Sequence, residues 1–269
     1  WHVLLLYVLV LLLVHVELSV ATIVDVFGTD YNSSLSTFIS VSGSSVTGTI
    51  PSRIGLLSKL GTIQISHSSV TGTIPLELGE LSRLGVLQIT NNSGINGPIP
   101  NTLDGGMENL ATLALTGNAL SQSIPTNIGQ LPAVGYLDVS NNQLTGTMPS
   151  QLGELSTLVT LLAVNDNAEL SGNIPSQLGT LSLLQNLHLQ NTKLTGQMPR
   201  EVLELSQLTT NTDNTLIFDN PTASPTVSPQ TGSPTESPQV GSHAARTNRD
   251  GISVFQSSLI AAVVLATLM

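Results

Sequence analysis

The sequence predicts an α/β solenoid of about seven 24-residue repeats built around a parallel β-sheet. A proline recurs at intervals of 24 to 26 residues between positions 51 and 199. Each proline closes a similar phrase, such as TGTIP at 47–51 or TGTMP at 145–149, and a segment of alternating apolar and polar residues precedes it. A fixed period of this length indicates a one-dimensional stack of equivalent supersecondary units.

The alternating segment of each repeat predicts a short strand with one buried face, because apolar residues occupy every second position. One such strand cannot bury its apolar side alone, so we expect the copies to stack about 4.8 Å apart as a parallel sheet. The predicted pairs of buried residues are Ile63/Ile65, Leu87/Ile89, Leu113/Leu115, Leu137/Val139, Leu161/Ala163 and Leu187/Leu189.

Glycine and proline mark the turns that follow each strand. A glycine such as Gly72 permits a turn with positive φ, and the proline that follows, here Pro75, cannot donate to a sheet and so opens the next segment. The LGxL sequence after the proline, for example Leu152–Leu155, has helical apolar spacing but is long enough only for a turn or two.

The repeat phrase LxxLxLxx(N)xLxGxIPxxLGxLxx resembles the plant-type leucine-rich repeat over about residues 36–210. The resemblance implies a right-handed superhelix, a concave sheet that serves as the usual recognition face, and a short second strand before each Ile-Pro pair. It also implies a structural ladder, in which the side chain at the asparagine position bonds backbone groups of adjacent coils. That position reads Ser44, Ser68, Asn92, Asn118, Asn142, Asp166 and Thr192, so we expect the ladder to be poorest at the two ends.

Irregular proline intervals locate insertions. Repeat three has an extra residue before Ile95 and another within 104–106, and repeat six has two extra residues that we place near Asn167 and Ala168. Insertions of this kind are tolerated in surface loops.

The repeat domain (36–210) is expected to lie between an N-terminal cap region (22–35) and a C-terminal edge (211–219). The chain contains no cysteine, so the paired-cysteine caps common in secreted members of the family are missing. We therefore expect packing alone to close both ends, with fraying there.

Residues 1–21 have the features of a signal peptide. The apolar run Val3–Val14 has the length of a signal-peptide core and is short for a membrane span, and small residues follow at Ser19 and Ala21. We expect cleavage after about Ala21 and, because the sequence begins with Trp1, a truncated signal. A buried strand or helix and an uncleaved anchor are the alternatives.

The C-terminal region predicts a stalk and a membrane attachment. Residues 220–240 are rich in Ser, Thr and Pro, which favours an extended stalk that is O-glycosylated or simply a bare linker. Residues 241–269 combine small residues, a polar spacer and an apolar tail, the pattern of a GPI signal with Ser242 as the attachment candidate. A single membrane helix is the rival, although Arg246 and Arg249 precede the apolar run rather than follow it.

Composition argues against several functional classes. The net charge is −10 and only 9% of residues are charged, which disfavours a nucleic-acid binder, and the absence of cysteine excludes a thiolate metal site. Asp138 and His188 are the titratable residues centred on the predicted face, but they lie two coils apart, roughly 10 Å, which is too far for a catalytic dyad. The sequence thus predicts no enzyme, no cofactor and no metal site.

The expected recognition face is neutral and rich in hydroxyl and amide groups. Its most varied patch is predicted to bind the ligand, and it consists of Tyr136, Asp138, Leu162, Val164 and His188. The alternative is that this face is simply solvated and that binding occurs elsewhere.

Two further surface features carry predictions. Asn32 and Asn91 begin N-glycosylation sequons that are usable in a secreted chain, although chance occurrence is a serious alternative. Threonine pairs such as Thr71/Thr73 and Thr145/Thr147 flank the repeat glycines and resemble ice-facing ladders, but threonine is also a good strand former.

Together these features predict a cell-surface recognition or adhesion protein, receptor-like or co-receptor and without a kinase, that enters the secretory pathway. Its expected partners are an extracellular protein, peptide or glycan at the concave face and the membrane at the C-terminal tail, with no nucleic acid. The alternatives are an ice-binding or cell-wall structural protein and an inhibitor of a secreted hydrolase.

Overall fold

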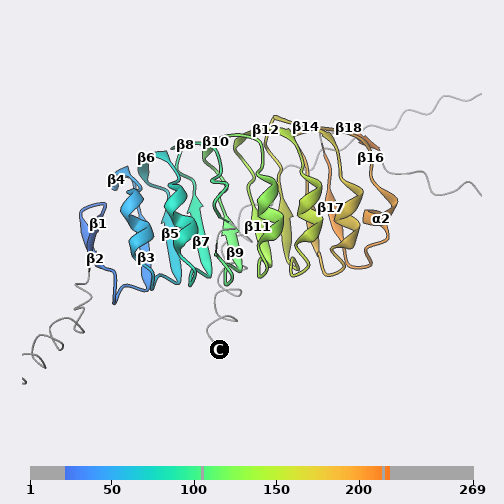
Figure 1. Cartoon of the computed structure of the whole chain (residues 1–269). Helices are drawn as coiled ribbons and strands as arrows, with labels where there is room; N and C mark the ends of the chain where they lie inside the picture. Colours follow the sequence, from blue (N-terminus) through green and yellow to red (C-terminus); the bar gives the residue numbers. More distant parts are fainter. Residues whose placement is uncertain (1–21, 104–105, 214–215, 219–269) are drawn as a thin grey trace, which may run out of the picture. The chain divides into compact units, whose positions relative to one another are not determined.

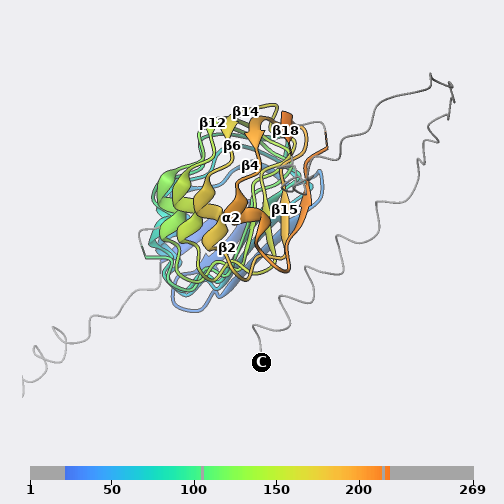
Figure 2. The same ribbon diagram turned by 90° about the vertical axis from the view of Figure 1, so that its right-hand side faces the viewer.

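The repeats form the predicted solenoid, and their strands make two parallel sheets (Figure 1). The computed structural model describes residues 22–103, 106–213 and 216–218. Each coil contributes a strand to the first sheet, a strand to the second sheet and, in most coils, a short helical turn. Viewed along the stack, the helical turns lie on one side and the first sheet on the other, with the second sheet joining them (Figure 2).

The first sheet is parallel throughout and, within the described residues, contains eight strands in the order β17-β15-β13-β11-β9-β7-β5-β3. These strands are β3 (Phe38–Ser42), β5 (Thr62–Ser66), β7 (Val86–Thr90), β9 (Thr112–Ala114), β11 (Tyr136–Asp138), β13 (Leu161–Ala163), β15 (Asn186–His188) and β17 (Thr209–Asn211). Equivalent residues lie opposite one another, so Ile63 is aligned with Leu87 and Leu87 with Leu113. The apolar ladder thereby becomes a continuous buried core.

The second sheet is also parallel but its register is staggered. Its strands in the described part of the chain are β4 (Thr47–Thr49), β6 (Ser69–Thr73), β8 (Gly94–Gly97), β10 (Ala119–Gln122), β12 (Gln143–Thr147), β14 (Glu169–Asn173), β16 (Lys193–Gln197) and β18 (Leu216–Phe218). Thr49 lies opposite Thr71 rather than opposite its repeat equivalent Thr73. Repeat-equivalent side chains are therefore displaced along the strands from one coil to the next.

The predicted short helical segments are present as single turns that each follow a proline. They are the 3-10 helices η1 (Ser52–Leu56), η2 (Leu76–Glu80), η3 (Thr126–Gln130), η4 (Ser150–Glu154) and η5 (Ser176–Thr180), and the α-helical turn α2 (Arg200–Leu203). A glycine in these turns allows the coils to approach closely. A Cβ on Gly129 would lie 2.1 Å from the carbonyl oxygen of Gln151 in the next coil, a distance that no side chain tolerates.

The N-terminal end is closed by an antiparallel hairpin of β1 (Ile23–Val26) and β2 (Thr29–Asn32). Val24 and Val26 are buried in the core, whereas Leu35 and Phe38 remain 76% and 52% exposed. The hairpin therefore covers the end of the core without burying every apolar side chain beside it.

The predicted register of coil six, the coil that contains β13 and β14, is wrong. Leu162 lies opposite Leu137 and Leu161 opposite Tyr136, so Leu162 and Val164 form the buried pair and both are 0% exposed. The sequence analysis predicts both extra residues of this repeat after the strand, but one precedes it, between Leu158 and Leu162. Because side chains alternate between the two faces of a strand, a slip of one residue moves every side chain to the other face.

The predicted signal peptide (1–21), stalk (220–240) and C-terminal tail (241–269) with Ser242 lie outside the described residues. Within the described ranges, no helix has the length and apolar character needed to cross a membrane.

Candidate functional site

The candidate site is the outward side of the first sheet, which we call the first-sheet face. Its central row is aligned across the coils by the strand register, and its residue types vary along the stack. That row consists of Ser40, Gln64, Gln88, Ala114, Asp138, Ala163, His188 and Asn211.

A hydrogen-bonded cluster on β11 organises the middle of this face. Asp138 Oδ1 accepts hydrogen bonds from the Ser140 hydroxyl at 2.6 Å and the Ser140 backbone N–H at 3.0 Å. The Tyr136 hydroxyl donates to Asp138 Oδ2 at 3.4 Å, and the Thr116 and Ser140 hydroxyls lie 2.8 Å apart. These bonds fix the carboxylate in position on the face.

Burial shifts the pKa values of the three titratable residues in this patch. Burial raises the pKa of Asp138, while hydrogen bonds from Ser140 and Tyr136 and the charge of His188 oppose the rise. Burial, together with the neighbouring Asp138, raises the pKa of Tyr136. Burial lowers the pKa of His188, and the attraction of Asp138 opposes that change. Ala163 of β13 lies between Asp138 of β11 and His188 of β15 in the central row. Asp138 and His188 are therefore on strands that are not neighbours, and they do not form an acid–base pair.

Of the five residues predicted to bind ligand, Tyr136, Asp138 and His188 lie on this face. Leu162 and Val164 do not, because the register of coil six places both in the core. The positions on the face in that coil belong instead to Leu161 and Ala163.

Beneath the face, an asparagine ladder joins the central coils. Asn118 Nδ2 donates to the carbonyl of Ile89 in the preceding coil at 2.7 Å, and its Oδ1 accepts the backbone N–H of Asn92 at 3.1 Å. Asn92 and Asn142 bridge adjacent coils in the same way. Thr192 donates only to Leu189 within its own coil, so the ladder stops there as a link between coils.

The residue that continues the ladder in coil six is Asn167, and the prediction of Asp166 is wrong. Asn167 Nδ2 donates to the carbonyls of Val139 and Val164, and its Oδ1 accepts the N–H of Leu144 at 3.0 Å. The same slip of register explains the error, because the extra residue before β13 moves the ladder position from Asp166 to Asn167.

Asp166 belongs to a column of corner residues at the strand ends. Asp166 has φ +55°, close to the values of Asn141 and Asn191 in the neighbouring coils. Asp and Asn adopt this left-handed conformation more readily than most residues do. Its carboxylate accepts hydrogen bonds at 2.6 Å from the side-chain amides of Asn165 and Asn191.

The sequence analysis did not predict two hydrogen-bond acceptors that lie near the Asp166 carboxylate. Asn165 Oδ1 and Gln190 Oε1 are buried atoms without a hydrogen-bond partner, in side chains that are themselves partly exposed. A buried carbonyl without a donor is uncommon in a folded protein. Aligning Asn167 with Asn142 in the sequence would have placed Asn165 on the face and revealed this region.

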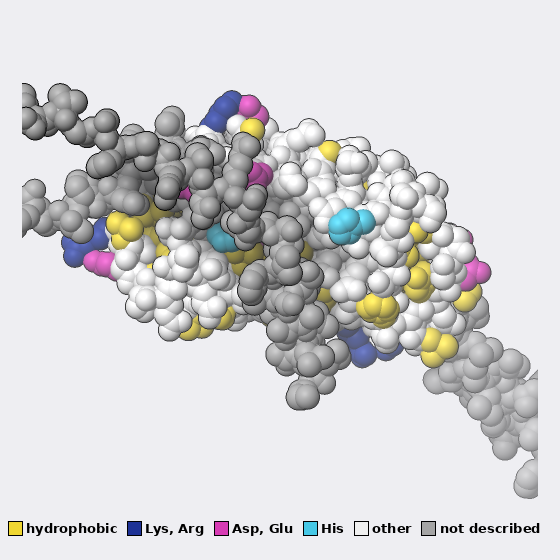
Figure 3. Space-filling model, turned by 180° about the vertical axis from the view of Figure 1, so that it is seen from behind, with side chains coloured by type: hydrophobic (Ala, Val, Ile, Leu, Met, Phe, Trp, Pro, Cys, Tyr) yellow, Lys and Arg dark blue, Asp and Glu magenta, His cyan; other side chains and the backbone are white. Residues whose placement is uncertain are grey.

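The first-sheet face bears no cation among the described residues. The described Lys and Arg residues lie on the helical turns, on the loops beside them or on the second sheet, and they are Arg53, Lys59, Arg83, Lys193 and Arg200. Figure 3 shows the molecule from the first-sheet side, with dark-blue side chains only at its margins and mostly white side chains between the grey atoms.

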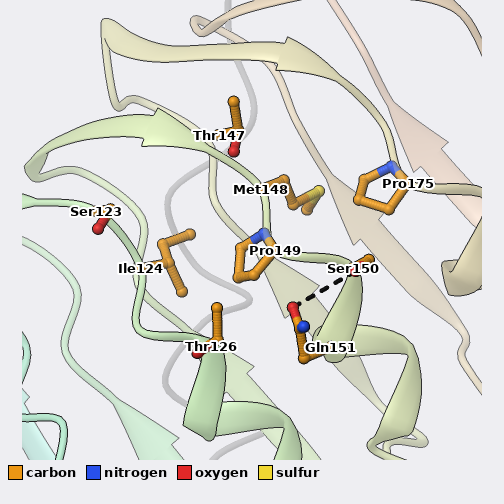
Figure 4. A pocket seen from close by; sticks show the side chains of 9 residues that line it. All are labelled: Ser123, Ile124, Thr126, Thr147, Met148, Pro149, Ser150, Gln151 and Pro175. Carbon is orange, nitrogen blue, oxygen red and sulfur yellow. Dashed lines mark hydrogen bonds between the residues drawn. The ribbon is translucent and has the colours of Figure 1, made fainter.

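The second sheet borders a hollow that has fewer chemically distinctive groups than the first-sheet face. A hollow of about 420 Å³ lies among residues of β12, η4 and the neighbouring turns, lined by side chains that include Ser123, Thr147, Met148 and Pro149 (Figure 4). Its lining has hydroxyl, amide and apolar groups but no charged or titratable side chain. It therefore supplies no acid, base or charged ligand group.

The threonine pairs of this sheet have a structural explanation. A Cβ added to Gly97 would lie only 2.9 Å from the methyl group of Thr73, so the threonine packs against the glycine of the next coil. The Thr71 hydroxyl donates to the carbonyl of Gly48 at 3.3 Å. Asn96 and Pro98 interrupt the pattern, and the stagger of the sheet separates equivalent threonines. This geometry does not favour the ice-binding alternative.

The two sequon asparagines lie in different settings. Asn91 is exposed at the corner after β7 with φ +57°, beside the first-sheet face. Asn32 is partly buried at the end of β2, and its Oδ1 accepts the N–H of Ser34 at 2.8 Å.

Comparisons with known proteins agree with this architecture. A family profile described as Leucine Rich Repeat matches residues 134–155. A comparison with the sequences of curated proteins gave no match.

Two solved receptor structures are similar to the chain. One is the LRR ectodomain of the plant membrane receptor kinase GASSHO1/SCHENGEN3 from Arabidopsis thaliana in complex with CASPARIAN STRIP INTEGRITY FACTOR 2, with 35% identity, a TM-score of 0.61 and coverage of 64% of this chain and 20% of that one. Another is the Arabidopsis receptor kinase HAESA in complex with the peptide hormone IDA and the co-receptor SERK1, with 31% identity, a TM-score of 0.60 and coverage of 67% and 30%. The match thus spans between a fifth and a third of the length of these two structures.

Proposed function

We propose, from the premise that this chain is a leucine-rich-repeat protein of the plant receptor type, that it recognises an extracellular peptide or protein segment through its first-sheet face. The observation that carries the proposal is the contrast across each strand of that sheet. The buried side repeats from coil to coil, whereas the outward side varies along the stack and carries Tyr136 and Asp138 on β11 and His188 on β15.

An extended surface of this kind suits an extended ligand. Stacked repeats present side chains at a regular spacing, so a peptide laid across the coils meets one outward side chain of the central row at each coil. Tyr136 combines an apolar ring with a hydroxyl already directed at Asp138, and tyrosine is frequent among residues that dominate binding energy. The similar receptors GASSHO1/SCHENGEN3 and HAESA, whose structures contain a partner molecule, support the same use of the fold here.

The cellular setting is part of the proposal. We propose that residues 1–21 direct the chain into the secretory pathway and that the stalk and C-terminal tail hold the repeat domain at the outer face of a membrane, by a GPI anchor on Ser242 or by a membrane helix. Glycans on Asn32 and Asn91 belong to the same setting. No feature of the described residues favours a hydrolase inhibitor or a cell-wall structural protein over recognition.

A peptide selection tests the proposed function. The purified full chain would be immobilised and used to select binders from a phage-displayed library of random twelve-residue peptides, and the affinity of the selected peptides would be measured by fluorescence anisotropy. We expect Tyr136→Ala to weaken binding by about thirtyfold, the scale of a hot-spot residue.

Leu76→Ala provides the matched control, because Leu76 is 56% exposed on the helical side of the coil. It should leave the affinity unchanged. Selection of no peptide, or equal loss of affinity in the two variants, would contradict recognition at the first-sheet face.

A further inference from the structure

We propose that the partner of the first-sheet face brings a cationic side chain, arginine in preference to lysine, to the strand ends of β13 and β15. This inference rests on the proposed function and specifies the chemistry of the segment recognised there. The position lies beyond Asp138 and His188 along the strands and is formed by Asn165, Asp166 and Gln190.

The side-chain amides of Asn165 and Gln190 leave two acceptors without donors. Asn165 Nδ2 donates to Asp166 Oδ2 at 2.6 Å, which turns the Asn165 carbonyl oxygen away from the carboxylate. That oxygen and Gln190 Oε1 have no donor within the described residues. Their backbones are adjacent, since the N–H of Asp166 donates to the carbonyl of Gln190 at 2.9 Å. Two neighbouring acceptors that lack donors call for a ligand rich in N–H groups.

The charge of this region is negative. Asp138 and Asp166 lie on this half of the sheet and its corner, Asp213 follows β17, and none of the described cations reaches the face. Burial lowers the pKa of His188, so this residue adds no compensating positive charge at neutral pH. The whole chain has a net charge of −10. A cationic segment is therefore complementary to this surface, and an acidic one is repelled.

Arginine fits this arrangement better than lysine does. A guanidinium group presents five N–H donors in a planar fork, so it can bond a carboxylate and neighbouring carbonyl oxygens together. An ammonium group presents three donors from one nitrogen and is more strongly hydrated. The two carbonyl oxygens are buried although their side chains are partly exposed, so binding requires the terminal torsions of Asn165 and Gln190 to rotate and turn the oxygens toward the ligand.

Peptides selected on the full chain test this inference. We expect arginine to be enriched among them relative to the starting library. In a selected peptide made synthetically, replacing the arginine with citrulline, which keeps the shape and removes the charge, should weaken binding about tenfold. Raising NaCl from about 50 to 300 mM should weaken the arginine peptide more than the citrulline peptide, because salt screens the ionic contribution.

Variants of the chain show which carboxylates contribute to the binding of arginine. Asp166→Asn and, separately, Asp138→Asn should each reduce the affinity for the arginine peptide while leaving the citrulline peptide nearly unaffected. Glu154→Gln removes a carboxylate from the exposed end of η4 and should change neither affinity.

The outcomes separate this inference from the proposed function. If selected peptides lose affinity with Tyr136→Ala but show no arginine enrichment and no response to Asp166→Asn, recognition stands and the cationic partner is wrong. If Glu154→Gln weakens binding as much as Asp166→Asn does, the attraction is a general effect of net charge and the inference is overturned. If no peptide is selected, both proposals fail.

Discussion

The two sides of the first sheet follow opposite rules. On the buried side, leucine, isoleucine and valine recur at the same two positions of each coil from β5 to β15, and the asparagine ladder beneath them repeats the same bonds from Asn92 to Asn167. On the outward side, the central row passes from serine through glutamine to aspartate, alanine and histidine. The repeated residues on the buried side determine how the coils stack. The variable residues on the outward side are available to bind a partner.

The contrast follows from what each side must satisfy. A buried strand face has to match the faces above and below it, so any departure leaves a cavity or an unpaired polar group. An outward side chain needs only water or a ligand, so its identity is free to change. Three predictions test this contrast.

The largest effect is expected from truncating a buried leucine in coil six. Leu162→Ala should lower the free energy of unfolding by about 3 kcal/mol, because it removes apolar contacts and leaves a cavity. Leu161→Ala, one residue earlier and on the outward side, should lower it by less than about 1 kcal/mol. Urea unfolding of the full chain compares the two variants, and a reversed order would contradict the register of β13.

A smaller effect is expected from the asparagine ladder. Asn167→Ala removes the partners of the carbonyls of Val139 and Val164 and of the N–H of Leu144, which should lower the free energy of unfolding by about 2 kcal/mol. Asp166→Asn keeps a residue suited to positive φ and should change it by less than about 0.5 kcal/mol. Equal destabilisation of the two variants in the same urea experiment would show that Asn167 does not carry the ladder.

The smallest effect is expected from titration of the outward side. The pKa of His188 in the folded protein is below its unfolded value of about 6.5, so His188 contributes stability that is present above that pH and is lost as the pH falls through the folded pKa. Asp138 has a raised folded pKa and acts in the opposite sense, since its contribution is lost as the pH rises through that pKa.

His188→Gln should therefore reduce the loss of stability between about pH 7.5 and 5.5 relative to the unmodified chain. Urea unfolding at the two pH values gives the result, and an unchanged pH dependence in His188→Gln would remove His188 from this role.

Sequence reasoning performed well on regular coils and failed where an insertion changed the count. In coil five, the predicted pair Leu137/Val139 is buried, and the face residues Tyr136 and Asp138 are where the period places them. In coil six, several apolar residues follow one another at 161–164, so alternation alone permits two registers. Only pairing with β11 decides between them, by placing Leu162 opposite Leu137.

The sequence by itself determined the solenoid, because a period of about 24 residues with a strand, a glycine, a proline and a short helical turn has no other way to bury its apolar residues. Tertiary structure alone decided the stagger of the second sheet, the register of coil six and the pairing of Asn165 with Asp166. These features depend on hydrogen bonds and packing between coils, which are distant in sequence. A repeat motif states which residues face inward within a coil, but contact with the adjacent coil fixes which groups remain available to a partner.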